Sequence, residues 1–212
     1  MPTKKELNNP DTCLRLWAHE CTRIFGDRLI NNEDRMWMLN AVRDCTRAPF
    51  SSNFDTVFAH LDTDKNGKVE TLDEFRGLTF GDLYTPFGMP DRPYEEIMDK
   101  VKLQQCAEDA LLQYNSISDK PMPLVLFNFA IEHLLRIGRV LKQPGGHALL
   151  VGVGGSGRQS LSRLASKIAD FDVFQVEIKK NYRQQEWRED VKELMRQVGS
   201  KGNPTTFLFT DT

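Results

Sequence analysis

The apolar residues of the first fifty positions recur at steps of three and four, which is the spacing of one face of an α-helix. Asp11 stands where a helix N-cap is expected and Gly26 where a C-cap glycine is expected, so a helix is predicted between them. A second helix is predicted from Glu33 to Arg47. The apolar stripe of the first helix is Leu14, Trp17, Ala18, Cys21, Ile24 and Phe25, and one side of the second helix carries Met36, Trp37, Asn40 and Ala41.

The middle of the chain, residues 49–120, is interrupted by prolines and glycines. Short helical pieces are predicted at 55–61 and 93–114, so this region connects two better-defined domains, 1–48 and 121–212. From Pro121 onward helical and strand patterns alternate, which is typical of a parallel sheet covered on both faces. The predicted order is helix 124–141, strand 148–153, helix 158–168, strand 173–178, helix 184–198 and strand 206–209.

The composition argues against several classes of protein. The chain has 212 residues, 40% of them hydrophobic and 27% charged, with a formal net charge of -2. That balance gives no basic footprint for nucleic acid, and no apolar run approaches the roughly 20 residues that span a bilayer. No apolar stretch follows the first lysines, so no signal peptide is expected. The four cysteines lack metal-ligand or disulfide-framework spacing, which favours a reducing cytoplasmic setting.

The candidate chemistry lies in the glycine-rich segment between the strand at 148–153 and the helix at 158–168. Small residues allow tight folding, so successive N–H groups can point at a polyphosphate, and the following helix adds its positive end. A strand–loop–helix setting makes this a P-loop prediction rather than a bare glycine string. The predicted nucleotide-binding residues are Gly152, Val153, Gly154, Gly155, Ser156, Gly157, Arg158, Gln159 and Ser160.

Two alternatives compete with the P-loop interpretation. One is a glycine-rich turn that binds nothing. The other is a dinucleotide-binding fold, because G-x-G-x-x-G can be written through Gly152, Gly154 and Gly157. The spacing G-x-x-x-x-G followed by a basic residue favours the P-loop.

The segment departs from the usual P-loop at the positions that perform chemistry. Arg158 stands where a lysine is usual; it keeps the charge but is a planar fork. Gln159 replaces the hydroxyl residue that ligates Mg²⁺, and Ser160 supplies a hydroxyl one residue late. Downstream, the apolar run 207–210 ends at Asp211 in the manner of a Walker B strand, so Asp211 is predicted to face Mg²⁺. Thr212 follows, where AAA+ ATPases have a catalytic glutamate. Binding without efficient hydrolysis is predicted.

A second candidate site is the acidic segment 62–73, which matches the spacing of an EF-hand loop. Asp62, Asp64 and Asn66 stand at positions one, three and five, and Gly67 at six. Position twelve is Asp73, which is shorter than the usual glutamate. A calcium-responsive helical module is therefore the alternative function, although Ca²⁺ is not expected as a cofactor. The same residues also favour a plain acidic turn.

Longer stretches of the chain resemble axonemal dynein heavy chains. The run 124–166, with Arg158-Gln159-Ser160 after the glycines, resembles the fourth AAA+ module of those motors, and 207–212 resembles the Walker B strand of that module. Residues 14–35 resemble the helical small subdomain that closes the third module, and 80–97 resemble the bridge between the two modules.

The resemblance implies an α/β fold, in which a helical N-terminal half like an AAA+ small subdomain precedes the start of a P-loop AAA+ parallel sheet. It implies ATP or ADP at residues 152–160, with adenine near Leu124 and Val125, and Mg²⁺ as a possible companion at Asp211. It further implies a minus-end-directed microtubule motor of the cilium or flagellum axoneme. The implied partners are the other AAA+ modules, the intermediate, light intermediate and light chains, and microtubules, with no nucleic acid or membrane.

Overall fold

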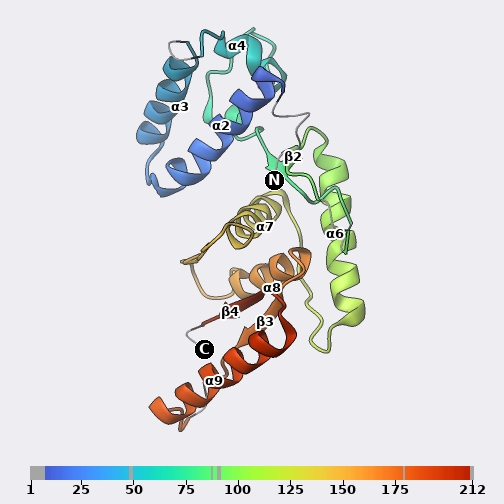
Figure 1. The fold of residues 1–212 in the computed structure, drawn as a ribbon. Coiled ribbons are helices and arrows are strands. Elements are labelled where there is room, and N and C mark those ends of the chain that lie inside the picture. Colours follow the sequence, from blue (N-terminus) through green and yellow to red (C-terminus); the bar gives the residue numbers. More distant parts are fainter. Residues whose placement is uncertain (1–7, 48–49, 87, 90–91, 179, 211–212) are drawn as a thin grey trace. The chain divides into compact units, whose positions relative to one another are not determined.

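The computed structural model describes residues 8–47, 50–86, 88–89, 92–178 and 180–210 (Figure 1). The chain divides into two compact units. The first comprises residues 1–82 and 91–100, and the second comprises residues 83–90 and 101–212. Asp211, the predicted Mg²⁺ ligand, and Thr212 lie outside the described residues.

The first unit begins with α2 (Pro10–Ile24), whose N-cap is Asn9 rather than the predicted Asp11. The Asn9 carboxamide oxygen accepts hydrogen bonds from the amides of Asp11 and Thr12 at 3.0 and 3.3 Å. Proline is favourable in the first turn because it has no amide hydrogen to leave unpaired. The C-cap is Phe25, and Gly26 instead opens the short 3₁₀ helix η1 (Gly26–Arg28).

Helix α3 (Asn32–Arg47) buries a different face from the predicted one. Trp37 is 73% exposed and Asn40 is exposed, so the predicted stripe through these two residues is wrong. The buried face of this helix packs against α2, α4 (Phe54–Val57) and α5 (Leu72–Phe75). The residues it buries are Met38, Leu39, Val42 and Thr46.

The rest of this unit consists of short elements around an aromatic core. They are α4 (Phe54–Val57), η2 (Ala59–Leu61), α5 (Leu72–Phe75) and the antiparallel pair β1 (Phe80–Gly81) and β2 (Glu95–Glu96). The rings of Phe54, Phe58 and Phe75 contact one another, with centroids 4.5 to 6.0 Å apart. The helix predicted at 55–61 is divided into α4 and η2 in the structure, and the helix predicted at 93–114 begins only at Lys100.

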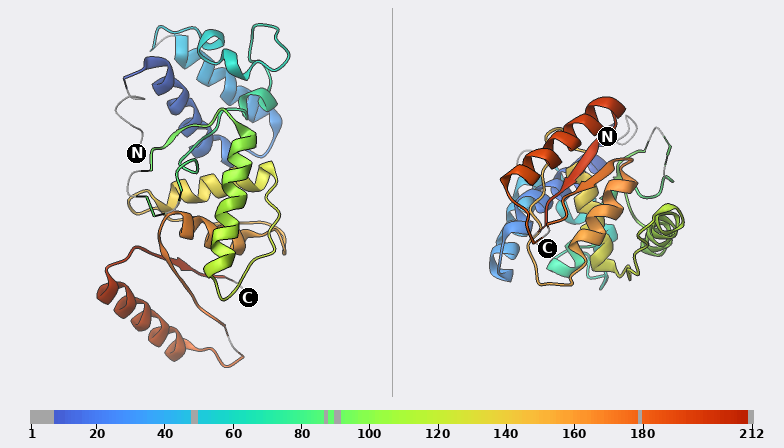
Figure 2. Two further views of the ribbon diagram at one scale, coloured as in Figure 1. Left: turned by 90° about the vertical axis from the view of Figure 1, so that its right-hand side faces the viewer. Right: turned by 90° about the horizontal axis from the view of Figure 1, so that it is seen from below.

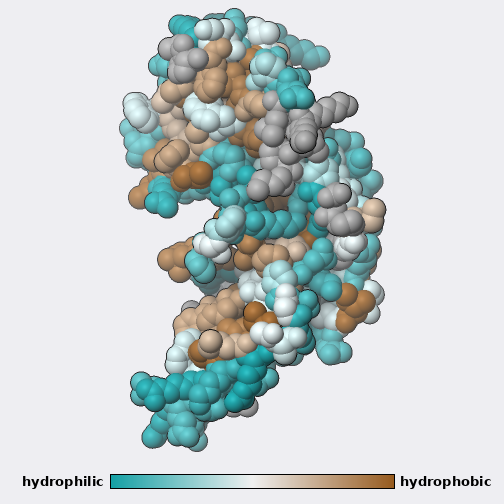
Figure 3. Space-filling model, viewed as in Figure 1, coloured by the Kyte–Doolittle hydropathy of each residue, from teal (hydrophilic) through white to brown (hydrophobic). Residues whose placement is uncertain are grey.

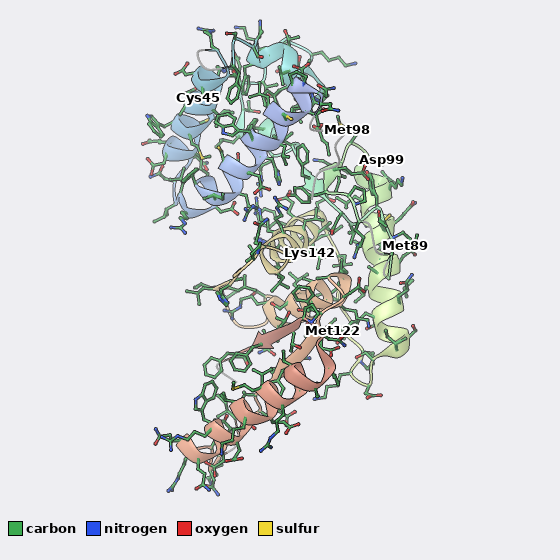
Figure 4. The ribbon with its side chains drawn as sticks, viewed as in Figure 1. Cys45, Met89, Met98, Asp99, Met122 and Lys142 are labelled. Atoms are coloured by element: carbon green, nitrogen blue, oxygen red, sulfur yellow. The ribbon has the colours of Figure 1, made fainter. Side chains whose placement is uncertain are left out.

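In the second unit, α6 (Lys100–Ile117) is held to the segment that follows it. The Asn115 side chain accepts a hydrogen bond from the Met122 amide at 2.8 Å and donates one to the Met122 carbonyl at 3.0 Å. Figure 4 labels Met122, and also Lys142, the C-cap of α7 (Asn128–Leu141). Helix α7 starts four residues later than predicted because residues 121–127 are not helical.

Two parallel strands, β3 (Asp172–Gln175) and β4 (Thr205–Leu208), form a sheet between α8 (Arg158–Ile168) and α9 (Gln184–Lys201) (Figures 1 and 2). Apolar residues of α7 and α8 pack together, while the aromatic rings of Phe207 and Phe209 contact Trp187 of α9. The outward side of α9 is hydrophilic (Figure 3). Among the described residues, no helix has the length and apolar character needed to cross a bilayer.

The predicted strand 148–153 is not a strand in the structure. Leu149 and Val151 are 90% and 85% exposed, and among the described residues β3 and β4 pair only with each other. A strand is stabilised by hydrogen bonds to a neighbouring strand. Because no described strand lies beside 148–153, this apolar segment remains irregular, and the prediction is wrong on this point.

Candidate nucleotide-binding site

The glycine-rich loop turns tightly just before α8. Gly155 and Gly157 both have φ of +77°, a left-handed conformation that residues with a side chain rarely adopt. The Ser156 amide donates to the Val153 carbonyl at 3.3 Å, and the Gly157 carbonyl accepts the Leu161 amide at 2.8 Å, which starts the helix. Alternation of left-handed and right-handed residues turns successive N–H groups towards one side, which is the geometry of an anion-binding nest.

The donors of this loop are open to a ligand. Within the part of the chain that the structure describes, the amides of Gly154, Gly155 and Gly157 donate no hydrogen bond to protein. A Cβ atom added at Gly154 or Gly155 would meet nothing within 4 Å, and both residues are exposed. Exposed amides without protein acceptors are suited to anionic oxygen atoms, and the N-terminus of α8 adds its positive dipole end at the same place.

Arg158 folds back over its own loop. Its guanidinium nitrogens lie 3.4 Å from the Leu150 carbonyl oxygen and 3.3 Å from the Val153 carbonyl oxygen. A Cβ atom at Gly152 would lie 3.4 Å from Ser156 Oγ and 3.7 Å from Arg158 Cδ, which are ordinary contact distances, so Gly152 lies directly beside the folded-back arginine. Because both hydrogen bonds are long, the fork can exchange these carbonyls for phosphate oxygens, which arginine binds through two nitrogens at once.

Side-chain contacts fix the direction of α8 against the sheet. Ser166, late in α8, donates a 2.9 Å hydrogen bond to Thr206 near the start of β4. Arg163, one turn earlier, donates to the side chain of Gln175, which is the last residue of β3. The helix therefore runs antiparallel to the strands, and the loop before it lies towards their carboxyl ends. This is the edge at which parallel α/β sheets bind ligands.

Other predicted site residues are distributed around this edge. Gln159 and Ser160 lie in the first turn of α8 and are partly buried. The Leu124 side chain lies beside the loop, because its Cδ1 would be 3.5 Å from a Cβ atom at Gly157, whereas Val125 is 79% exposed. Ser160 carries a hydroxyl group and Asp211 a carboxylate, and oxygen ligands are the kind that Mg²⁺ prefers. These residue types therefore suit that ion.

The acidic segment adopts a closed loop in which carboxylates bind amides of the same segment. The Asp62 carboxylate accepts from the amides of Asn66 at 3.2 Å and Gly67 at 2.8 Å. Asp64 accepts from the Asn66 amide at 3.1 Å and from the Asn66 side chain at 2.9 Å. Although partial removal from water raises the pKa of Asp62, these hydrogen bonds set it below its ordinary value.

A residue that the sequence prediction left out completes this loop. Asp62 and Asp64 approach Glu74, with ligand atoms within 4.8 Å of one another, whereas the predicted Asp73 is exposed and outside this group. Glu74 and Thr71 form a capping box at the start of α5, and the hydrogen bond from the Thr71 hydroxyl is the largest cause of the lowered Glu74 pKa. The spacing Thr-x-x-Glu is a sequence signature from which this role could have been predicted.

The sequence analysis also does not predict the hydrogen bonds that link Arg163, Gln175 and Thr210. Gln175 donates through its side-chain nitrogen to the Thr210 hydroxyl at 3.4 Å, as well as accepting from Arg163. No local spacing predicts these contacts, because they depend on which strands are neighbours and on how α8 crosses them. A glycine loop that opens a helix at the carboxyl edge of parallel strands is typical of P-loop nucleotide-binding α/β proteins, although residues 148–153 do not form the strand that usually precedes such a loop.

Comparison with known proteins identifies the family. Residues 122–212 match the family model described as the P-loop containing dynein motor region D4. Human dynein axonemal heavy chain 3 is 45% identical over 205 residues, which is 97% of this chain and 5% of that protein. Mouse dynein axonemal heavy chain 2 is 45% identical over 199 residues, 93% of this chain and 4% of that protein.

The mouse dynein axonemal heavy chain 12 is 44% identical over 191 residues, 89% of this chain and 6% of that protein. The chain thus belongs to the axonemal dynein heavy chain family, as a homologue of one segment of the motor region. It spans only about one twentieth of the length of these curated relatives. The identification as a relative of axonemal dyneins and the α/β fold class are confirmed.

Proposed function

We propose that residues 152–160 bind the phosphates of ATP or ADP, and that this site retains nucleotide more effectively than it hydrolyses it. The single observation that carries the proposal is the set of unoccupied amide donors at Gly154, Gly155 and Gly157, at the start of α8. A polyphosphate supplies acceptors to such a loop, and Arg158 offers a mobile cation beside it. In this proposal Leu124 and Val125 contact the adenine.

The preference for binding over hydrolysis rests on the residues that perform chemistry in related sites. Arg158 replaces the usual lysine, Gln159 replaces the usual Mg²⁺-binding hydroxyl, and Thr212 stands where a glutamate would activate water. Threonine is not a base at neutral pH, so no residue at that position can accept the proton of the attacking water. Mg²⁺, held by Asp211, would neutralise phosphate charge without completing a hydrolytic site.

The parent context is also part of the proposal. The family membership favours a segment of a motor ring that takes part in minus-end-directed movement along microtubules in cilia and flagella. The other AAA+ modules of the heavy chain, and the intermediate, light intermediate and light chains, would be its partners, in the cytoplasm and the axonemal cytoskeleton. Within such a ring, a nucleotide held without rapid turnover would act as a structural or regulatory ligand.

Calorimetric titration of the 212-residue chain with ATP and with ADP tests the proposal. We expect saturable binding that weakens by roughly 10- to 100-fold in Arg158→Ala, because charge-assisted hydrogen bonds to phosphate contribute about 1.5–3 kcal/mol. Arg158→Lys, which keeps the charge, should lose less. Phosphate release should be negligible in all three proteins. Absence of binding by the unaltered chain would contradict the nucleotide assignment, and rapid, Arg158-dependent phosphate release would contradict the preference for binding.

A further inference from the structure

A small polar pocket lies in the first unit, between the end of α3 and the start of α4. Cys45, which Figure 4 labels, belongs to the same last turn of α3. All but one of the residues that line the pocket are polar or charged. They include Arg43, Arg47, Ser51, Asn53 and Asp55. The cavity volume is about 360 Å³. Ligand pockets of proteins begin at about 300 Å³, so this pocket can hold a small molecule or a single side chain.

One of the two arginines of the pocket is already neutralised. Arg43 donates to both carboxylate oxygens of Asp55, at 3.0 and 3.1 Å, and its guanidinium carbon lies 4.5 Å from the centre of the Phe54 ring. Another of its nitrogens donates to the Val69 carbonyl. Arg43 and Asp55 therefore form a fixed wall whose charges cancel, and the second arginine, Arg47, sets the net charge of the pocket.

The side-chain groups of the pocket that remain unused are hydrogen-bond donors. Asn53 Oδ1 accepts from the amides of Asp55 and Thr56 at 3.0 and 3.4 Å, which fixes the carboxamide and leaves its nitrogen without an acceptor. Within the part of the chain that the structure describes, the Arg47 guanidinium makes no ion pair or hydrogen bond, and neither does the Ser51 hydroxyl. The pocket therefore offers one uncompensated positive charge and several free donors, while the carboxylate of Asp55 and the side-chain oxygen of Asn53 are occupied.

Ser51 has an unusual backbone conformation beside the pocket. Its φ is +52°, in the left-handed region that residues with a side chain rarely adopt. The turn that contains it is closed by the Ser52 amide, which donates to the Thr46 carbonyl at 3.1 Å. Glycine would adopt this conformation at lower cost but has no hydroxyl. A serine at this position therefore adds a donor to the pocket at the expense of local strain.

We propose that this pocket binds a phosphate monoester, as a ligand site additional to residues 152–160. The inference goes beyond the proposed nucleotide-binding function and does not depend on it. A phosphate ester is an anion whose oxygens accept hydrogen bonds, which suits a pocket whose unused groups are donors. Arg47 can bind two phosphate oxygens through its planar fork, Ser51 and Asn53 can donate to the others, and the remaining volume can hold the organic part of the ester. Because the carboxyl end of α3 carries partial negative charge, binding depends on Arg47 and is expected to be weak.

Titration of the ¹⁵N-labelled 212-residue chain with glycerol 2-phosphate, at neutral pH and constant ionic strength, tests the inference. In ¹H–¹⁵N spectra we expect saturable shifts of the Ser51 and Ser52 amides, with a dissociation constant on the order of 1 mM. Arg47→Gln should weaken binding by roughly 10-fold, because it removes the charge-assisted hydrogen bonds. Ser51→Gly, which tolerates the same backbone conformation without the hydroxyl, should weaken binding by roughly 3-fold.

Arg28→Gln is the matched control, because it removes the same charge from an exposed arginine outside the pocket and should bind as the unaltered chain does. Arg158→Ala should also leave the shifts at Ser51 and Ser52 unchanged, which separates this site from the glycine-rich loop. Absence of saturable shifts, the same shifts with sodium chloride, or equal weakening in Arg28→Gln and Arg47→Gln would each overturn the inference and leave the proposed function standing. Binding of inorganic phosphate without binding of glycerol 2-phosphate would overturn the assignment to a monoester.

Discussion

The two loops that carry candidate ligand chemistry, 62–74 and 152–160, differ in where their hydrogen-bond acceptors come from. In the acidic loop, the amides of Asn66 and Gly67 bind the Asp62 carboxylate, and Glu74 accepts from the amides of Glu70 and Thr71 at 3.1 and 3.0 Å. In the glycine-rich loop, Gly154 and Gly155 supply donors and no side-chain acceptor. The first loop supplies acceptors for its own amides, whereas the amides of Gly154 and Gly155 in the second loop face solvent and are open to an external acceptor.

The two loops also differ in how many internal hydrogen bonds hold their shape. The acidic loop is tied to its surroundings through Val69, which is fully buried: its carbonyl accepts from Arg43 and its amide donates to Asp55 at 3.3 Å. The glycine-rich loop has few internal bonds, and its shape depends on the left-handed conformations of Gly155 and Gly157. Ligand binding would therefore order the second loop, while the first is already ordered by its own charges.

The largest effect is expected when the glycine-rich loop is given a side-chain acceptor of its own. Gly154→Asp places a carboxylate beside the amide donors, where a Cβ atom meets nothing within 4 Å, so the fold should tolerate it. We expect ATP affinity to fall on the order of 100-fold, because a like charge is placed against the phosphates and competes for their donors. Calorimetric titration measures the effect.

Gly154→Asn is the matched control, because it has nearly the same shape without the charge. It should lose far less affinity than Gly154→Asp. Equal losses in the two variants would mean that the shape of the loop, rather than its lack of acceptors, determines binding, and the contrast between the two loops would then fail.

Acid provides a second, smaller test, because only one loop contains carboxylates. The pKa values of Asp62 and Glu74 are lowered in the folded chain. A lowered pKa means that the stabilisation is fully present above the unfolded values of about 3.9 and 4.3, and is lost as pH falls through the folded values. Below about pH 4 the amide resonances of Asn66 and Gly67 should shift in a ¹H–¹⁵N spectrum, ahead of those of Gly154 and Gly155. A simultaneous change in both loops would instead indicate global unfolding.

Much of the helical structure follows from local sequence, and the failures have physical causes. Helix α8 was predicted at its observed bounds because its apolar face and its glycine N-cap lie within one segment. Residues 148–153 are as apolar as a buried strand, but a strand also needs a neighbour, and no property of the segment itself reports whether one is present. On α3, periodicity predicts a helix but does not decide which face is buried, and Trp37 is exposed in the structure.

In the candidate sites, too, features that are local in the sequence can be predicted and contacts between distant residues cannot. The tight turn of the glycine-rich loop before α8 could be predicted because its residues are contiguous and glycine allows the conformation. The role of Glu74 follows from its spacing to Thr71, whereas the EF-hand spacing predicts Asp73 at this position. The contact of Gln175 with Arg163 and Thr210 joins residues that lie 12 and 35 positions apart. Such contacts follow from strand order and helix direction, which a single sequence does not encode locally.

The smallest expected effect is that of Ca²⁺ on the acidic loop. Both Glu74 oxygens already accept hydrogen bonds, one from the Thr63 amide at 3.4 Å and the other from Glu70 and Thr71. Coordination of Ca²⁺ by Glu74 would break the capping box of α5, and Asp73 lies outside the cluster. We therefore expect millimolar CaCl₂ to leave the unfolding midpoint unchanged relative to the same concentration of MgCl₂. If Ca²⁺ instead raises the unfolding midpoint by several degrees, and the rise is absent in Asp62→Asn, the acidic loop is a calcium site. The hydrogen-bonded loop described here would then be its metal-free form.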